Sequence, residues 1–222
     1  IFCEGQWFKS TLRYLYKTSS RFVVISKNFK NSNTGYSFHY FKIIQIKMEH
    51  IEVTIIGAGI VGLAIAAESS KKRQTLVIEK HEGFGRETSS RNSEIIHSGI
   101  YYSKNSLKAK LCLEGNNLIY EICRKNNIPC KNTGKLIIAS KDDEISKLEE
   151  LLKKGTDNGL QNLEILPEHK VRKLEPNINA RVALFSPTSG IVDSHKLMEF
   201  FESQINSNEN GILLYNQEVI DI

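Results

Sequence analysis

The order of apolar and polar residues predicts strands that alternate with helices over most of the chain. The run VTII at residues 53–56 is typical of a buried strand, and it leads through a glycine-rich turn into an apolar helix. A second strand-like run, TLVIE, follows at residues 75–79. Between residues 106 and 127, aliphatic side chains recur at spacings of four, seven and four, which predicts a helix. These apolar positions are Leu107, Leu111, Leu118 and Ile122.

Shorter elements are predicted in the middle of the chain. KLIIA at residues 135–139 is typical of a strand, and a charged amphipathic helix is predicted from about residue 142 to 154, where Gly155 would end it. LEIL at residues 163–166 and VALF at residues 182–185 predict two further strands, with a short helical turn between them. These elements form a region of mixed strand and helix.

The last forty residues are predicted to return to the first group of elements. SPTSGIVDS at residues 186–194 is rich in turn-forming residues, and Gly190 is expected to make the turn. Asp193 with His195 resembles a catalytic pair, but the helical pattern that follows favours Asp193 as an N-cap. ILLYNQEVIDI at residues 212–222 predicts two short strands.

This pattern indicates the α/β class, with a Rossmann-like nucleotide-binding lobe that has a parallel sheet and an inserted lobe of mixed α+β structure. We expect a leader at residues 1–47, the first part of the nucleotide-binding lobe at 48–130, the first part of the inserted lobe at 131–187, and the return at 188–222. Because a dinucleotide-binding fold has more parallel strands than these residues supply, we expect the N-terminal portion of a longer protein.

Residues 1–47 differ in composition from the rest. They hold eight Lys or Arg against one acidic residue and 11 of the 19 aromatic residues, without a clear helical or strand period. Three interpretations remain open: a mitochondrial transit peptide, a stretch upstream of a true start at Met48, or a disordered tail. The second and third interpretations would both leave the protein cytoplasmic. The remainder has 22 basic and 24 acidic residues, so it lacks the positive charge typical of nucleic-acid binding.

The four cysteines do not indicate a metal site. They lack a C-x-x-C pair and histidine partners at ligand spacing. Cys112 and Cys123 are predicted on one helix, about 16 Å apart at the usual rise per residue, which is beyond disulfide reach. We therefore interpret the cysteines as reduced thiols. The full set is Cys3, Cys112, Cys123 and Cys130.

The glycine-rich turn after the first strand has the form G-x-G-x-x-G. Gly57 suits a tight turn, Gly59 lets the backbone approach a pyrophosphate, and Gly62 lets the helix close on the strand. Glu79, 22 positions after Gly57, ends the second strand, where a carboxylate accepts hydrogen bonds from ribose hydroxyls. The alternative is an ordinary glycine turn between a strand and a helix.

A polar stretch at residues 81–102 follows, in place of the crossover helix of a nicotinamide-binding fold. Its short hydroxyl and amide side chains suit a phosphate-rich ligand, although a capped loop would look similar. Within it, His97 has a side chain whose usual pKa suits a general base. A structural histidine bonded to backbone carbonyls is the alternative. Tyr101, Tyr102 and Lys104 are candidates for binding a carboxylate, and a surface loop is the alternative.

Residues 87–112, ETSSRNSEIIHSGIYYSKNSLKAKLC, together with NTGKLIIA at 132–139 and SGIVDSHKL at 189–197, resemble the FAD-dependent L-2-hydroxyglutarate dehydrogenase/oxidase family. The resemblance implies FAD as cofactor, with Gly57, Gly59 and Gly62 on the pyrophosphate and Glu79 on the adenosine ribose. It further implies a phosphate and ribityl contact from the polar cluster and an adenine contact from the backbone of Val219. The cluster consists of Ser89, Ser90, Arg91 and Asn92.

The same resemblance implies the reaction. The complete protein would oxidise L-2-hydroxyglutarate, a 2-hydroxy diacid, to 2-oxoglutarate, with the hydride passing to flavin N5 and the electrons then to a quinone or oxygen. We expect part of the substrate's anion sockets beyond Ile222. Two alternatives are a related glycerol-3-phosphate dehydrogenase or amino-acid oxidase, and a non-catalytic nucleotide-binding fragment. Membrane attachment and oligomeric state remain open.

Overall fold

The structure is a computed structural model that describes residues 50–221 in full and only the backbone of residues 15–18, 21–26 and 42–46. It divides into two units, Ile1–Val53 and Thr54–Ile222. In the first unit, β1 (Leu15–Thr18), β2 (Arg21–Ser26) and β3 (Lys42–Ile46) form an antiparallel sheet in that order. The sequence predicted no strands there. The rest of the predicted leader lies outside the described residues.

One sheet of the second unit is parallel. Its strand order is β12 (Gly211–Leu214), β5 (Thr75–Ile78), β4 (Val53–Ile56). β12 pairs with β5 in parallel, from Gly211 opposite Thr75 to Leu214 opposite Ile78. The strand next to β5 therefore comes from a distant part of the chain. This sheet confirms the predicted α/β class.

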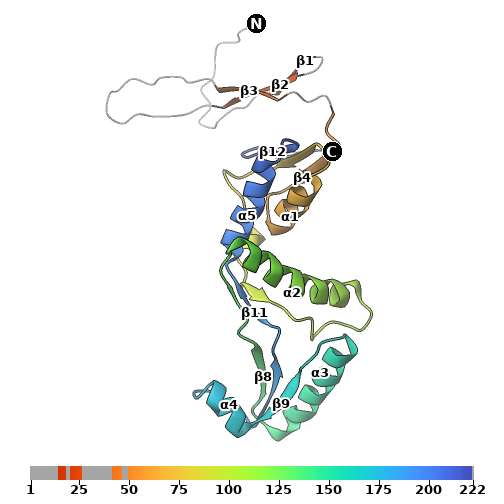
Figure 1. The fold of residues 1–222 in the computed structure, drawn as a ribbon, viewed down its shortest axis with the longest axis vertical. Coiled ribbons are helices and arrows are strands. Elements are labelled where there is room, and N and C mark those ends of the chain that lie inside the picture. Colours follow the sequence, from red (N-terminus) through yellow and green to blue (C-terminus); the bar gives the residue numbers. More distant parts are fainter. Residues whose placement is uncertain (1–14, 19–20, 27–41, 47–49, 222) are drawn as a thin grey trace, which may run out of the picture. The chain divides into compact units, whose positions relative to one another are not determined.

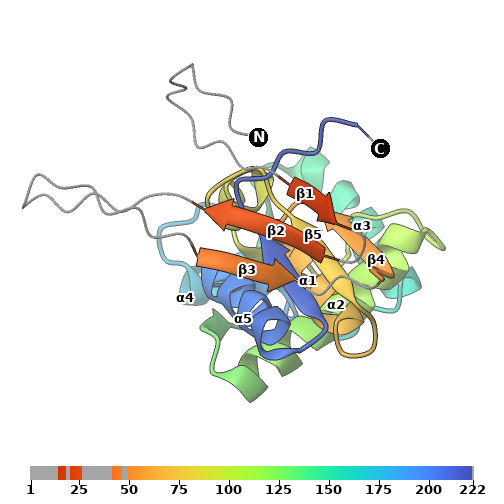
Figure 2. The ribbon, with the colours of Figure 1, turned by 90° about the horizontal axis from the view of Figure 1, so that it is seen from above.

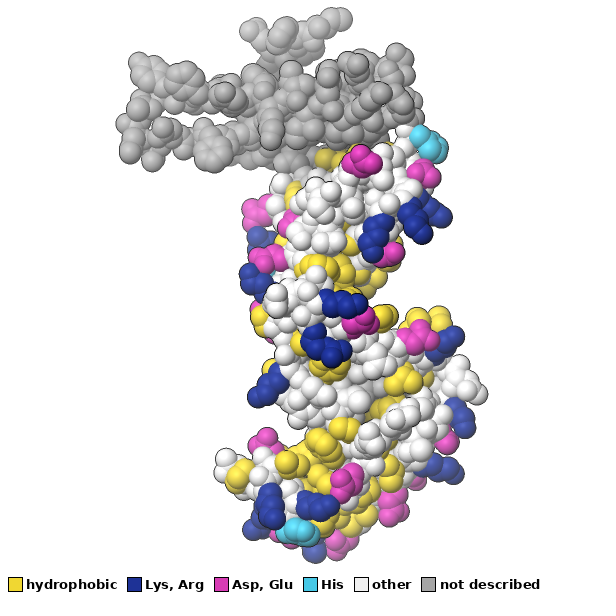
Figure 3. Space-filling view, viewed as in Figure 1, with side chains coloured by type: hydrophobic (Ala, Val, Ile, Leu, Met, Phe, Trp, Pro, Cys, Tyr) yellow, Lys and Arg dark blue, Asp and Glu magenta, His cyan; other side chains and the backbone are white. Residues whose placement is uncertain are grey.

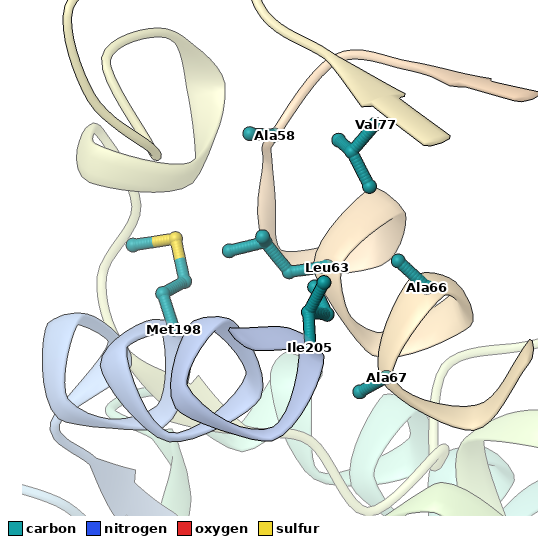
Figure 4. Packing of buried hydrophobic residues seen from close by; sticks show 7 residues of the cluster. All are labelled: Ala58, Leu63, Ala66, Ala67, Val77, Met198 and Ile205. Atoms are coloured by element: carbon teal, nitrogen blue, oxygen red, sulfur yellow. The ribbon is translucent and has the colours of Figure 1, made fainter. Parts of the chain in front are cut away.

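Two helices pack on this sheet and on each other (Figure 1 and Figure 2). α1 (Ile60–Ser69) contacts β5, and α5 (Ser194–Ser207) contacts β12. Figure 4 shows the core between them, where small alanines let the helices approach closely. The buried side chains are Ala58, Leu63, Ala66, Ala67, Val77, Met198 and Ile205.

A second sheet is antiparallel, in the order β8 (Lys135–Ala139), β10 (Val182–Ser186), β9 (Glu164–Pro167). A 3-10 turn at Asp142–Glu144 leads into α3 (Ile145–Asp157), and α4 (Glu168–Leu174) follows β9. The prediction that Gly155 ends this helix was wrong, because α3 continues past it. Gly155 is buried instead, and a Cβ there would lie 2.5 Å from Leu163 Cδ1.

The third sheet is small and joins distant segments: β6 (Ile95–Ile96), β11 (Gly190–Val192), β7 (Cys130–Lys131). The prediction that Gly190 makes a turn was wrong, because it lies in β11 opposite Ile96. A Cβ at Gly190 would lie 2.1 Å from the Tyr120 hydroxyl and 2.4 Å from the Lys131 carbonyl oxygen. The glycine is therefore required for close packing in the strand.

The long predicted helix is present as α2 (Leu107–Asn126), and Ser106 caps it by accepting a hydrogen bond from Ala109 N. The apolar stripe that predicted the helix is largely exposed, however: Leu107 is 70% exposed and Leu118 is 54% exposed. The buried positions of α2 are Ala109, Asn116 and Cys123. The apolar period therefore located the helix correctly but did not mark the side that is buried within residues 54–222.

The last regular elements of the described chain are α5 and β12. Asp193 is the N-cap of α5, as predicted, and its Oδ1 accepts from Lys196 N at 2.8 Å. The second strand predicted in this region is absent, since residues 215–221 form no regular element after β12.

On the face in Figure 3, basic and acidic side chains are interspersed over the described residues. Among those residues, no helix has the length and apolar character to cross a bilayer.

Candidate functional site

The turn between β4 and α1 is built from glycine. Gly57 has φ of +98°, which L residues rarely adopt, and its amide donates to the Ile78 carbonyl of β5 at 2.8 Å. Gly59, two residues later, is the N-cap of α1, which begins at Ile60. The backbone therefore reverses sharply at the end of the strand and exposes the start of a helix.

A side chain at either of the other two glycines would meet a close neighbour. A Cβ at Gly62 would lie 2.2 Å from the Gly57 carbonyl oxygen, so the first turn of α1 sits directly against the loop. A Cβ at Gly59 would lie 3.0 Å from Ser89 Oγ. The turn thus presents bare backbone beside the Ser89 hydroxyl.

The Glu79 carboxylate ties this turn to the segment after β5. It is 7% exposed; its Oε2 accepts from Ala58 N at 2.8 Å and its Oε1 accepts from His81 N at 2.8 Å. The Glu79 carbonyl oxygen accepts from Gln217 N at 2.9 Å, which places the segment containing Val219 beside it. Each carboxylate oxygen keeps a second lone pair for a further donor.

The first amides of α1 offer a site for an anion. Ile60 N donates to Ser89 Oγ at 3.0 Å, whereas the residues described at 50–221 supply no acceptor for the amides of Val61 and Gly62. The first turn of the helix carries no acidic residue. Unpaired amides and the positive end of the helix dipole together favour a phosphate here.

The predicted polar cluster divides into two parts in the structure. Ser89, on a 3-10 turn at Thr88–Ser90, reaches the α1 amide. Ser90 Oγ and Asn92 Nδ2 donate instead to carbonyls of the same segment, at 2.9 Å and 2.6 Å, so they shape the turn. Arg91 is exposed, and its guanidinium forms no ion pair within the described part of the chain. Ser89 is therefore the member of this cluster whose side chain hydrogen-bonds the start of α1.

The carboxylate of Glu87 links the turn that carries Ser89 to the residues after β5. Glu87 Oε1 accepts from His81 Nε2 at 2.8 Å and lies 3.0 Å from Lys80 Nζ. These partners, first the hydrogen bond from His81 and then that from Lys80, lower the pKa of Glu87 to about 2. The carboxylate is therefore ionised at neutral pH and joins the end of β5 to the turn that carries Ser89.

His97 follows β6 with its backbone fixed and its ring exposed. Its carbonyl oxygen accepts from Asn116 Nδ2 at 3.0 Å and from Cys112 Sγ at 3.5 Å. No polar group among residues 50–221 hydrogen-bonds the imidazole. The ring is therefore free to bind an external group, while buried neighbours set the position of its Cα.

Sequence reasoning missed the buried polar groups that hold this segment. Asn116 is 5% exposed and also donates to the Thr188 carbonyl at 2.9 Å. The Ser186 hydroxyl donates to Ser98 Oγ at 3.0 Å and lies 3.4 Å from Ser189 Oγ. The one signal in the sequence was the hydroxyl-rich run at residues 186–189, which we assigned to a turn.

The residues predicted to bind carboxylate have other partners. Lys104 Nζ lies 3.6 Å from Asp157 Oδ2, and Lys108 Nζ lies 4.6 Å from the centre of the Tyr102 ring. Lys135 Nζ lies 4.8 Å from the centre of the Tyr101 ring. A carboxylate at Lys104 would have to compete with Asp157.

The described cysteines are free thiols, as predicted. Burial, with a smaller contribution from Cys130, raises the pKa of Cys123 to about 12. Within residues 50–221, no three His, Cys, Asp or Glu side chains lie close enough together to hold a metal ion.

Comparison with known proteins agrees with this geometry. Residues 52–222 match the family described as "FAD dependent oxidoreductase". A mitochondrial L-2-hydroxyglutarate dehydrogenase of Arabidopsis thaliana is 41% identical over 178 residues, covering 78% of this chain and 37% of the relative. The enzyme of that name from Homo sapiens is 39% identical over 171 residues, covering 76% and 37%. The chain thus spans less than half the length of these relatives.

Solved structures show the same fold. An L-alpha-glycerophosphate oxidase from Mycoplasma pneumoniae with FAD bound superposes with a TM-score of 0.70 at 30% identity, covering 79% of this chain and 47% of that one. A glycine oxidase from Bacillus cereus superposes with a TM-score of 0.67 at 21% identity, covering 78% and 48%. The second likeness bears on the fold alone.

Proposed function

The chain belongs to the family of FAD-dependent oxidoreductases, and we propose that its full-length protein oxidises L-2-hydroxyglutarate to 2-oxoglutarate with FAD as hydride acceptor. The observation that carries the substrate assignment is the 41% identity to an L-2-hydroxyglutarate dehydrogenase over 178 residues. The geometry of the described site supports the cofactor assignment independently of that identity.

The glycine turn fits a dinucleotide. In this proposal Gly57, Gly59 and Gly62 hold the pyrophosphate: Gly57 makes the turn, Gly59 offers bare backbone to the ligand, and Gly62 lets α1 close on the turn. The open amides of α1 donate to the pyrophosphate. Glu79 accepts from the adenosine ribose through its remaining lone pairs, and the backbone of Val219 contacts the adenine. Ser89, Ser90, Arg91 and Asn92 line the path toward the flavin. When bound, FAD supplies a two-electron acceptor for a hydride.

His97 is proposed as the general base. A ring nitrogen would take the proton from the substrate hydroxyl as the C–H bond at the same carbon breaks. Two observations support this role: the imidazole is exposed, and no residue at 50–221 engages it. The hydrogen bond to its carbonyl from Asn116 holds the residue in place. A histidine with a purely structural role would itself bond to backbone carbonyls.

We also propose a division into lobes and a cellular location. We propose that residues 48–130 and 188–222 belong to the FAD-binding lobe, and that residues 131–187 begin a substrate-binding lobe. The relatives carry "mitochondrial" in their names, which favours a mitochondrial location with residues 1–47 as a transit peptide. A quinone or oxygen would reoxidise the flavin.

A second substrate is favoured by one observation. The solved structure with a TM-score of 0.70 is an L-alpha-glycerophosphate oxidase at 30% identity. This supports a related reaction on glycerol 3-phosphate, which shares with L-2-hydroxyglutarate an anionic group and a secondary hydroxyl. The higher identity to the dehydrogenases favours the diacid.

Anaerobic single-turnover kinetics with the full-length protein separate these substrates. Flavin absorbance is followed after mixing with L-2-hydroxyglutarate, its D enantiomer, glycerol 3-phosphate or glycine. We expect rapid bleaching with L-2-hydroxyglutarate and at least about 100-fold slower bleaching with the others, a difference of about 2.7 kcal/mol in barrier. Faster bleaching by glycerol 3-phosphate would move the assignment to the second substrate.

A further inference from the structure

Glu94 has a backbone conformation that its side chain does not favour. Five non-glycine residues in the described part of the chain have positive φ; four are asparagines, and the fifth is Glu94 at +56°. Asparagine tolerates this region because its short amide bonds locally, but a glutamate has no such compensation. Contacts from elsewhere in the fold must therefore hold Glu94 in place.

Those contacts come from the start of α5. Glu94 Oε1 accepts from Ser194 N at 3.0 Å and from Ser194 Oγ at 2.7 Å, across 100 residues of sequence. The Glu94 carbonyl oxygen accepts from Val192 N at 3.0 Å. Since Ser194 is the first residue of α5, the carboxylate also lies at the positive end of the helix. Asp193 caps a different amide, that of Lys196.

The same residue connects to the glycine turn. Glu94 N donates to Asn92 Oδ1 at 2.6 Å, and Asn92 Nδ2 donates to the Ser89 carbonyl at 2.6 Å. Ser89 Oγ in turn accepts from Ile60 N, the first residue of α1, at 3.0 Å. A continuous series of hydrogen bonds therefore runs from the N-terminus of α5 to the N-terminus of α1.

We propose that Glu94 is a positioning residue that holds residues 89–97 in the conformation that accepts FAD. The inference rests on the proposed function. Without the carboxylate, the segment would sample other conformations, and the apparent dissociation constant would rise by the inverse of the competent fraction. The strained backbone at Glu94 is kept because the Ser194 contact compensates for it.

Three variants of the full-length protein separate the carboxylate from the strain. Glu94→Ala removes the contact and keeps an unfavourable φ, whereas Glu94→Gly removes both the contact and the strain. Glu94→Gln keeps an oxygen that can accept both Ser194 donors. Glu199→Ala is the matched control, because this exposed glutamate of α5 pairs only with the neighbouring Lys196 in the described structure.

Three quantities are measured: thermal stability of the apo protein, the FAD dissociation constant, and hydrogen exchange of residues 88–97. We expect Glu94→Ala and Glu94→Gly to weaken FAD about tenfold, or about 1.4 kcal/mol. Both variants should lose protection from hydrogen exchange at residues 88–97. The apo form of Glu94→Gly should be more stable than that of Glu94→Ala, because glycine removes the backbone strain. Glu94→Gln should bind FAD within about threefold of wild type, and Glu199→Ala should match wild type.

Two results would overturn the inference. If Glu94→Gly binds FAD as wild type does, the carboxylate is dispensable and only backbone strain matters. If the loss of affinity follows the loss of apo stability across all variants, Glu94 has a general structural role. A wild-type protein that binds no FAD would instead refute the proposed function, and the inference with it, and this result is distinct from both.

Discussion

The glycine turn at residues 57–62 and the segment around His97 achieve rigidity in opposite ways. The tightest packing within the turn is between neighbours in sequence: a Cβ at Gly62 would lie 2.2 Å from the carbonyl oxygen of Gly57, five residues earlier. The His97 segment is fixed from far away, by Asn116 and by the Ser186–Ser98 hydroxyl contact across 88 residues. We therefore expect the glycine turn to be disrupted by adding side-chain atoms, and the His97 segment to be disrupted by removing the polar groups that bond to it.

The largest effect is expected from adding one methyl group to the turn. Gly62→Ala places a Cβ against backbone that cannot move aside, so we expect loss of FAD binding and a stability loss above about 4 kcal/mol. Gly115→Ala in α2 is the control, because its Cβ would meet nothing within 4 Å. That change should stabilise the helix by up to about 1 kcal/mol. Equal stability of the two variants in chemical denaturation would contradict the account.

His97→Ala should affect catalysis while leaving the cofactor bound. If the imidazole takes the substrate proton, kcat should fall by about 100-fold to 10,000-fold with flavin content unchanged. Single-turnover flavin reduction, normalised to bound FAD, measures this directly. A rate within about threefold of wild type, or a loss of flavin in its place, would show that the histidine is structural.

Asn116→Leu removes the amide that holds His97 while keeping a similar volume. The carbonyls of His97 and Thr188 would each lose a donor, so we expect a stability loss of about 1–3 kcal/mol. The rate of flavin reduction should fall less than in His97→Ala. Asn117→Leu, at the adjacent exposed position, is the control. A variant as stable and as fast as wild type would show that this buried amide has no positioning role.

The smallest expected effect is the dependence of stability on pH through Glu87. The pKa of Glu87 is lowered to about 2 from 4.5, so its stabilising contacts with His81 and Lys80 are present above about pH 4.5. They are lost as the pH falls toward 2, when the carboxylate becomes protonated. The difference in melting temperature between wild type and Glu87→Gln should therefore shrink over this range. A difference that stays constant from pH 6 to the acid limit would contradict this linkage.

The sequence predicted the elements that depend on local patterns and missed those that depend on long-range contacts. The turn at Gly57, the strands at 75–78 and 135–139, and the Asp193 cap are all encoded within a few residues. Gly155 and Gly190 were assigned to a helix end and a turn because glycine usually marks those sites. Their roles come from tertiary packing: Leu163 and Ile100 lie against Gly155, and Tyr120 lies against Gly190.

The candidate site shows the same division. Glu79 and Ser89 could be proposed from motif and resemblance, and the structure places both against the glycine turn. Ser90 and Asn92 were proposed with them, but their side chains bond within their own segment. Asn116 could not be found, since a lone buried amide has no sequence period. Ser186 lies in the hydroxyl-rich run at residues 186–189, which was assigned to a turn.

The central claim is that the glycine turn and its surroundings bind FAD, and titration of the apo full-length protein tests it most directly. Flavin fluorescence on adding FAD, with NAD as competitor, should show tight binding of FAD that NAD does not displace. Gly59→Val should abolish the binding, because its side chain would fill the space beside Ser89 Oγ. Tighter binding of NAD than FAD, or normal FAD binding by Gly59→Val, would contradict the account.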